Sequence, residues 1–379
     1  MLLYNAVFGR EIEGLPLKLI LCGDVMTGRG IDQIMRHPSD PKLFEDYIKT
    51  ATGYVDLVEA IHGPIHKPVQ SDYIWGDALE WLRHAEVDAR IINLETSVTY
   101  SRTSWPKGVN YKMNPKNIPC LTAAKIDCCC LANNHVLDWG YEGLVETLEA
   151  LERAGLAVAG AGRDVTRAET PAVLNIGDKS RLIAFAFGST TSGIPAEWAA
   201  ASHQPGVNLL PDLSWTTAER IAAQVHALKR SGDVVVASIH WGENFGYRIP
   251  AEQRNFAHYL IDIAGIDVVQ GHSSHHAKAA EVHRGKLVLY GCGDFLNDYE
   301  GISGHEAFRG DLVLMYLPTV DTSGQLLDLM MVPFQLRHLR LNRAGVDDVE
   351  WLRRTLSGQG AHYGTRVERT AEDALQLVW

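Results

Sequence analysis

The order of the expected strands and helices constrains the fold of this chain most. In the first two-thirds, apolar runs short enough for buried strands alternate with helical stretches, from 17–22 to 266–270. This alternation predicts parallel pairing. In the last third strand follows strand, and 277–284 and 286–290 are separated only by Gly285, which predicts a tight antiparallel pair. Two mixed sheets packed face to face, with helices outside, fit this order. A (β/α)8 barrel, which needs a helix after each strand, is the lesser alternative.

The length of the chain, 379 residues, suits two ordinary domains or one large α/β domain with additions. We find no internal repeat, low-complexity tract or linker. We therefore expect a single domain over 1–379, with its core at about 17–317 and with the strands and helix of 318–379 packed on that core. The net charge of −11 disfavours nucleic acid and anionic membranes as partners.

The sequence favours a cytoplasmic protein that does not contact a membrane. Residues 1–16 lack the basic and apolar regions of a signal peptide, and no apolar run reaches the roughly 18–20 residues of a membrane span. Five of the six cysteines lie in apolar stretches, which is typical of buried thiols in a reducing compartment. The absence of a Cys-x-x-Cys pair disfavours a thiolate zinc site.

Five expected strands each end in a side chain that could bind a metal ion. In open α/β sheets, functional groups collect beyond the carboxyl ends of the strands. Carboxylates combined with neutral imidazoles and an amide oxygen suit a divalent ion such as Mn²⁺, Zn²⁺ or Fe²⁺. Each motif alone has an ordinary alternative, such as a turn, a helix cap or a hydrogen-bonded histidine, but five in succession favour a metal site. These side chains are Asp24, Glu95, Asn134 with His135, His240, and His272 with His275.

The same motifs, taken together, resemble those of CapA-type proteins, the poly-γ-glutamate capsule proteins of the calcineurin-like metallophosphoesterase superfamily. The resemblance covers about 17–317. It implies a four-layered α/β/β/α sandwich with a two-metal centre at the strand ends. The matching stretches are Gly23-Asp-Val-Met-Thr-Gly-Arg29, Asn93-Leu-Glu95, Ala132-Asn-Asn-His-Val-Leu-Asp-Trp-Gly140, His240-Trp-Gly242 and Gly271-His-Ser-Ser-His275.

The resemblance also implies which residues hold the first ion. Glu95 would bridge the two ions, and Asn134, His240 and His272 would complete one site.

The second implied site departs from the superfamily pattern. It would use Asp24 and His275 together with the bridging Glu95. The first motif of the superfamily usually reads Asp-x-His, whereas Met26 stands at the position of that histidine. CapA-type proteins generally share this loss. Three ligands make a weak site, so the expected cofactor is one or two divalent ions, Mn, Zn or Fe, or none if the chemistry uses side chains alone.

The groups expected to do chemistry lie beside these ligands. The resemblance makes His135 the proton donor and Asp138 its orienting partner, and it has Arg29 face an anionic group. The family's common Gly-Asn-Phe reads Gly-Asp-Phe here, which adds the carboxylate of Asp294. We expect Asp294 or His305 to act as an acid or base, the alternative being a solvated polar loop.

The aromatic and basic loop at 101–115 is a candidate rim for the substrate, although a solvated surface loop is the more common use of such a segment. We expect a small molecule or a peptide as substrate. The sequence leaves its identity and the oligomeric state open.

Three functions fit these residues. The favoured one is a metal-dependent hydrolase in which a bound ion activates water against a phosphoester or a γ-glutamyl or peptide-like amide, with His135 protonating the leaving group. The second is a metal-independent peptide epimerase, resembling relatives in lasso-peptide pathways, in which Asp24 or His305 takes the Cα proton and a histidine returns one. The third is a non-catalytic binding protein that keeps the fold and an ion.

Overall fold

The structure is a computed structural model that describes residues 16–177 and 180–379. The expectation that residues 1–16 form no signal peptide concerns a segment that, apart from Pro16, lies outside the described residues. Among the described residues, no helix is long and apolar enough to cross a membrane. The cytoplasmic location stays a prediction.

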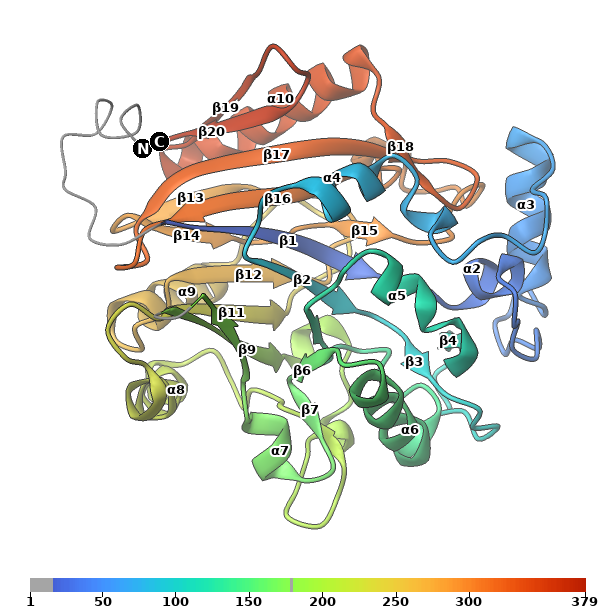
Figure 1. Cartoon of the computed structure of the whole chain (residues 1–379), viewed down its shortest axis with the longest axis horizontal. Helices are drawn as coiled ribbons and strands as arrows, with labels where there is room; N and C mark the ends of the chain where they lie inside the picture. Colours follow the sequence, from blue (N-terminus) through green and yellow to red (C-terminus); the bar gives the residue numbers. More distant parts are fainter. Residues whose placement is uncertain (1–15, 178–179) are drawn as a thin grey trace.

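Two large sheets form the centre of the molecule, as Figure 1 shows. The ten-stranded sheet has the order β19-β20-β17-β16-β1-β2-β5-β6, with β15 beside β1 and β18 beside β17. Its strands are β1 (Leu17–Val25), β2 (Ala89–Leu94), β5 (Cys128–Cys130), β6 (Ala157–Ala159), β15 (Asp294–Leu296), β16 (Leu312–Val320), β17 (Leu326–Leu336), β18 (Leu341–Arg343), β19 (Arg366–Arg369) and β20 (Leu375–Val378).

The second sheet has six strands in the order β13-β14-β12-β11-β9-β8. Its strands are β8 (Ala172–Ile176), β9 (Ser180–Gly188), β11 (Val234–His240), β12 (Val268–His272), β13 (Ala280–His283) and β14 (Lys286–Leu289). Two short pairs complete the strands: β3 (Ser97–Val98) with β4 (Lys112–Met113), and β7 (Ala161–Gly162) with β10 (Gly206–Val207).

The strand pairing confirms the predicted change from mainly parallel strands in the first two-thirds of the chain to mainly antiparallel strands in the last third. β1, β2, β5 and β6 pair in parallel in one sheet, and β9, β11, β12 and β14 do so in the other. β13 and β14 form the expected antiparallel pair around Gly285. Across the described residues both sheets are mixed and open at their edges, which excludes the (β/α)8 barrel.

The C-terminal part extends the ten-stranded sheet. From β16 the sheet continues outward through β17, β20 and β19. The expected boundary between the core and the C-terminal part, near residue 317, therefore falls inside β16. β17 ends at Leu336, and beyond it His338 and Leu339 take left-handed backbone angles, with φ of 62° and 53°. The chain turns there and returns as β18.

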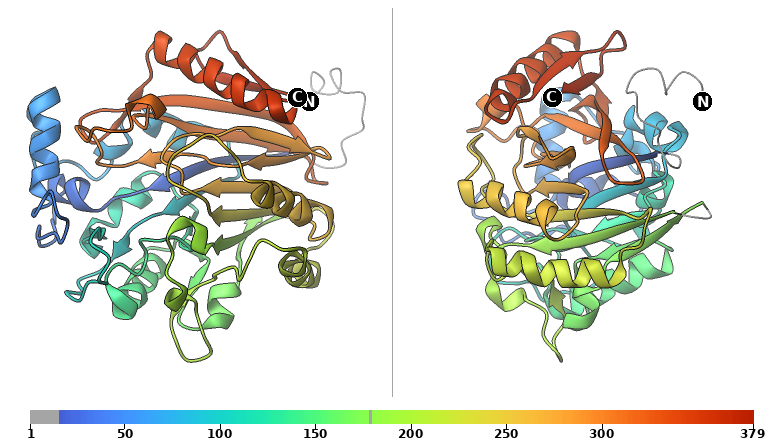
Figure 2. Two further views of the ribbon diagram at one scale, coloured as in Figure 1. Left: turned by 180° about the vertical axis from the view of Figure 1, so that it is seen from behind. Right: turned by 90° about the vertical axis from the view of Figure 1, so that its left-hand side faces the viewer.

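The helices lie outside the sheets, and Figure 2 shows this arrangement from behind and from the side. α8 (Trp215–Leu228) and α9 (Ala251–Asp262) cover one face of the six-stranded sheet. Helices α4 (Ala78–His84), α5 (Pro119–Ala123), α6 (Gly140–Arg153) and α10 (Val346–Gly360) pack with the ten-stranded sheet. The shorter or more peripheral ones are α2 (Arg29–Ile34), α3 (Thr52–His62) and α7 (Val165–Glu169).

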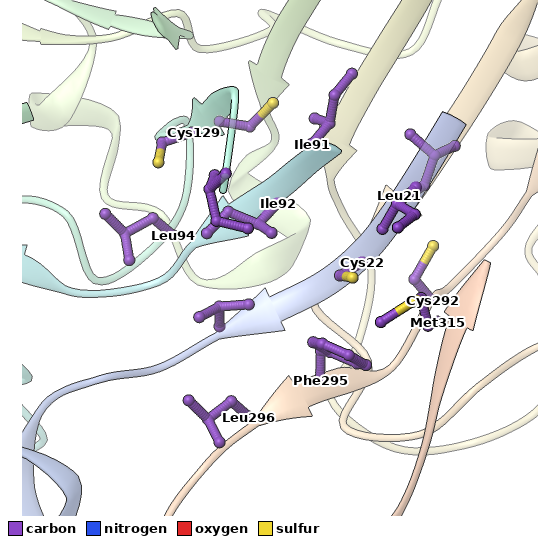
Figure 3. Packing of buried hydrophobic residues seen from close by; sticks show 14 of the residues in the cluster. Leu21, Cys22, Ile91, Ile92, Leu94, Cys129, Cys292, Phe295, Leu296 and Met315 are labelled. Carbon is purple, nitrogen blue, oxygen red and sulfur yellow. The ribbon is translucent and has the colours of Figure 1, made fainter. Parts of the chain in front are cut away.

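Alternation along β9 divides its side chains between two cores. Ala184 faces the core shared with the ten-stranded sheet, whereas Phe185 faces the core under α8 and α9, because successive strand residues point to opposite faces. Figure 3 shows side chains of β1, β2, β15 and β16 in the first core. The Gln270 amide donates to the Cys22 carbonyl at 2.7 Å and so links the two sheets. All six cysteines are buried and free, as predicted.

Candidate metal centre

The predicted strand ends meet on one side of the molecule. β1, β2, β11 and β12 run in the same direction (Figure 1), so their carboxyl ends lie together. Asp24 lies near the end of β1 and Glu95 directly follows β2. His240 and His272 are the last residues of β11 and β12 and face each other in register.

Two imidazoles and a carboxylate form the first group of potential ligands. Asp24 Oδ1 lies 3.5 Å from His272 Nδ1 and 3.8 Å from His240 Nδ1. The two Nδ1 atoms are 2.8 Å apart. On their outer nitrogens, Asn134 Oδ1 lies 3.0 Å from His240 Nε2, and Ser238 Oγ lies 2.7 Å from His272 Nε2. Three predicted ligands, Asp24, His240 and His272, are therefore within reach of one another, and a fourth, Asn134, contacts the outer nitrogen of His240.

Three buried carboxylates form the second group. Asp24, Glu95 and Asp294 each offer an oxygen within 4.8 Å of the others. Asp24 is held by the Asn93 amide, which donates to Oδ1 at 2.7 Å, and by the Ser273 N–H, which donates to Oδ2 at 3.0 Å. Asp24 belongs to both groups, whereas the resemblance implied that Glu95 is the shared ligand. Bridging by Glu95 stays a prediction.

The charges of this cluster are poorly balanced without a cation. Burial, strengthened by the charge of Asp294, raises the pKa of Asp24 to about 8. Burial and the neighbouring Asp24 and Asp294 raise the pKa of Glu95 well above its usual range. Burial lowers the pKa of His240 and takes that of His272 to about 3. Neutral imidazoles beside mutually repelling carboxylates are the donor set that a divalent ion requires, so the residues fit a metal.

His275 was expected to bind an ion together with Asp24 and Glu95, but its ring contacts Asp294. Its Nδ1 lies 3.0 and 3.1 Å from the two carboxylate oxygens of Asp294. Burial would lower the pKa of His275, but the charge and hydrogen bond of Asp294 outweigh it and raise the pKa. The Asn297 amide donates to Asp294 at 2.7 Å. The structure thus brings Asp294 into the carboxylate group and places His275 behind it; a ligand role for His275 stays a prediction.

His135 and Asp138 form the expected pair. His135 Nδ1 lies 2.6 Å from Asp138 Oδ2, and His135 Nε2 lies 4.0 Å from Glu95 Oε1. The other carboxylate oxygen, Asp138 Oδ1, lies 2.8 Å from the Lys107 ammonium. Burial lowers the pKa of His135 to about 4. A neutral imidazole with its proton on Nδ1 leaves a lone pair on Nε2, which favours a proton acceptor over the predicted proton donor.

Arg29 pairs with anionic groups of the protein itself. Its side chain is 2% exposed. The guanidinium donates to Glu45 at 2.9 Å, to Asp298 through Nε at 3.2 Å, and to the Tyr54 hydroxyl at 2.7 Å. Its charge is therefore already compensated by two buried carboxylates. The contact with an anionic substrate group that the resemblance implied stays a prediction.

His305 lies at the rim and not in the cluster. It is exposed and stacks on Phe245, with ring centroids 3.7 Å apart. The Phe245 ring in turn lies 5.3 Å from that of His275. The acid or base role of His305 stays a prediction.

Sequence reasoning missed the contacts that two residues of the 101–115 loop make. Lys107 contacts Asp138, and the Tyr111 ring stacks on that of His135. The signal was the aromatic and basic composition of this loop, which marked it as a candidate rim but gave no partner for either residue.

A separate group of potential ligands lies between α9 and β13. His258, Glu281 and His283 offer ligand atoms within 4.8 Å of one another. The Arg254 guanidinium already contacts both oxygens of Glu281, at 2.7 and 3.2 Å, and the Tyr290 hydroxyl donates to it as well. Because that carboxylate is compensated, we assign no metal to this group.

The comparison with known families identifies the family of this chain. The family model described as "Bacterial capsule synthesis protein PGA_cap" matches residues 18–299, and the chain belongs to this family. A "probable polyglutamine synthesis accessory protein" of Mycobacterium tuberculosis strain H37Rv is 46% identical over 363 residues, which is 95% of each chain.

More distant relatives include the "Capsule biosynthesis protein CapA" of Bacillus anthracis, 25% identical over 290 residues, or 76% of this chain and 61% of the relative. The "PGA biosynthesis protein CapA" of Bacillus subtilis is 26% identical over 278 residues, or 73% of this chain and 62% of the relative. The predicted resemblance to CapA-type proteins is confirmed.

Proposed function

We propose that this protein is a metal-dependent hydrolase of the CapA type that acts on a γ-glutamyl or peptide-like amide, or on a phosphoester. One observation carries the proposal: the buried carboxylates of Asp24, Glu95 and Asp294 meet beside the neutral imidazoles of His240 and His272. Burying three carboxylates together is costly unless a cation lies among them.

We assign the first ion to Asp24, His240 and His272. The Asn134 amide oxygen lies at the other ring nitrogen of His240. The second is assigned to Asp24, Glu95 and Asp294.

We assign no ligand role to Met26, because its sulfur accepts the Gly28 N–H at 3.1 Å. Asp294 therefore provides the ligand that the Met26 position lacks. When bound, the ions would act as Lewis acids and lower the pKa of a coordinated water.

The protein groups beside the ions have separate tasks. His135 accepts a proton at Nε2 from the attacking water, while its Nδ1–H stays bonded to Asp138. The Lys107 ammonium compensates the Asp138 carboxylate, so that carboxylate can stabilise the imidazolium that forms without an unpaired buried charge.

The charges around the site bear on the substrate. Lys107 is paired with Asp138, and Arg29 with Glu45 and Asp298. A dianionic phosphate gains little from cations that are already compensated, and this favours the amide substrate over the phosphoester. The names of relatives, which refer to polyglutamine and capsule synthesis, point the same way.

We also propose that the sheets and helices form the four-layered α/β/β/α sandwich of the superfamily. The separate cores on the two faces of the six-stranded sheet support this assignment.

The proposal is tested with the purified protein on a γ-glutamyl anilide, a short γ-linked glutamate oligomer, and phosphate mono- and diesters. We expect turnover of the glutamyl substrates that a chelator abolishes and that added Mn²⁺, Zn²⁺ or Fe²⁺ restores. Glu95→Gln should lose turnover, while Asp262→Asn on the distant end of α9 should keep it. Turnover that survives the chelator would contradict the proposal. Solvent deuterium entering a peptide Cα without metal would instead support the epimerase.

A further inference from the structure

We infer that Tyr111 is a positioning residue that holds the imidazole of His135 in line with the carboxylate cluster; this inference rests on the proposed function. Tyr111 belongs to the 101–115 loop and is 3% exposed. Its ring stacks on the His135 ring, with centroids 3.7 Å apart and planes at 15°.

Besides stacking on the face of the imidazole, Tyr111 holds the carboxylate that contacts the Nδ1 edge of the ring. The Tyr111 N–H donates to Asp138 Oδ2 at 2.6 Å, and the same oxygen lies 2.6 Å from His135 Nδ1. One residue therefore sets the plane of the ring through its side chain and anchors the hydrogen-bond acceptor of the ring through its backbone. With the ring plane and the Asp138 acceptor both held, His135 Nε2 is directed toward Glu95, whose Oε1 lies 4.0 Å away.

The surroundings hold Tyr111 itself in place. Its hydroxyl lies 2.6 Å from the Tyr299 hydroxyl, and the Trp139 indole N–H donates to its carbonyl at 3.1 Å. The Arg29 guanidinium carbon lies 4.7 Å from the ring centroid, and Asp298 binds that guanidinium through both of its oxygens. The buried Arg29 is thus part of the support for the ring.

We expect loss of the Tyr111 ring to lower the catalytic rate and to leave metal and substrate binding unchanged. A proton acceptor displaced by about 1 Å can lose as much as about 100-fold in rate, although neither the ligands of the metal nor the substrate contacts change. Removing the Tyr111 ring while keeping the backbone N–H should therefore free the imidazole to tilt without breaking the bond to Asp138.

The test compares Tyr111→Phe with Tyr111→Leu, because Phe keeps the stack and loses only the hydroxyl. Tyr100→Leu, at an exposed tyrosine just before the loop, is the matched control. We expect kcat to fall about 10-fold to 100-fold in Tyr111→Leu, with KM and metal content unchanged, and to stay near wild type in Tyr111→Phe and Tyr100→Leu. Equal kcat in Tyr111→Leu and wild type would overturn the inference.

A second measurement separates this inference from the proposed function and needs no variant to fold. In the wild-type protein with isotope-labelled histidine, the ring current of a stacked tyrosine should move the His135 ring protons upfield, and Tyr111→Phe should keep that shift. Upfield-shifted His135 protons in a protein without hydrolase activity would support the stack and refute the proposed function. Unshifted protons in the wild-type protein would overturn the inference whatever the activity.

Discussion

Asp294 lies directly beside Asp24, because β15 pairs in parallel with β1 and sets these two residues in register. This pairing joins segments far apart in the chain and brings a third buried carboxylate to Asp24 and Glu95. We propose that this carboxylate supplies the ligand that is missing where Met26 stands in place of the histidine of the superfamily pattern.

Replacing Asp294 should therefore weaken one of the two metal sites selectively. We expect Asp294→Asn to lower the affinity for the second ion at least 10-fold to 100-fold, while the ion at Asp24, His240 and His272 remains. Titration of the metal-free protein with Mn²⁺ measures the number and affinity of the sites. Two unchanged affinities in Asp294→Asn would show that this carboxylate is not a ligand.

The metal-free protein should become less stable as the pH rises from about 6.5 to 8. The folded-state pKa of Asp24 is raised to about 8 from an ordinary value of 3.8, and that of Glu95 is raised as well. The unfolded chain therefore binds fewer protons than the folded chain over this range, and the free energy of unfolding falls with pH by up to about 1.4 kcal/mol per unit for each group. The raised pKa of His275 acts in the same direction.

Denaturant unfolding in the presence of a chelator measures this slope. The buried neutral His135 and His272, with pKa values of about 4 and 3, oppose this slope mainly below about pH 6.5. Above that value the slope reports the carboxylates together with His275. Saturating metal should remove the slope, because the bound ion displaces the protons. A metal-free protein that gains stability between pH 6.5 and 8 would contradict the assignment.

Asp138→Asn should reduce turnover without releasing metal. The amide cannot stabilise an imidazolium at His135 as a carboxylate does, so we expect kcat to fall about 100-fold. The metal content should stay at the wild-type level, since Asp138 lies in neither group of ligands. Steady-state kinetics and elemental analysis of the same preparation give both quantities, and an unchanged kcat would remove His135 from the mechanism.

Arg29→Ala should act on stability more than on substrate binding. It leaves Glu45 and Asp298 buried without their cation, and breaking a buried pair in this way costs about 3–5 kcal/mol. Denaturant unfolding checks the loss, with Arg354→Ala on the exposed side of α10 as the control. A stable Arg29→Ala protein with a raised KM would restore the substrate-binding role that the sequence implied.

The strand ends were predictable from the sequence because they depend on local patterns. Apolar runs followed by Asp24, Glu95, His240 and His272 mark the carboxyl ends of parallel strands, and parallel pairing brings such ends together.

The contacts of Asp294 and Tyr111 depend on pairing and packing between distant segments, which no local pattern encodes. The compensation of Arg29 escaped prediction for the same reason, since its partner Asp298 lies 269 residues away.

We propose that Asp24 belongs to both groups of metal ligands, and elemental analysis of gently purified protein is the decisive test of this sharing. We expect one or two equivalents of Mn, Zn or Fe per wild-type chain and a loss of all bound metal in Asp24→Asn, with Asp262→Asn as the control. A wild-type protein that carries no metal and binds none on titration, or an Asp24→Asn protein that retains the wild-type content, would contradict it.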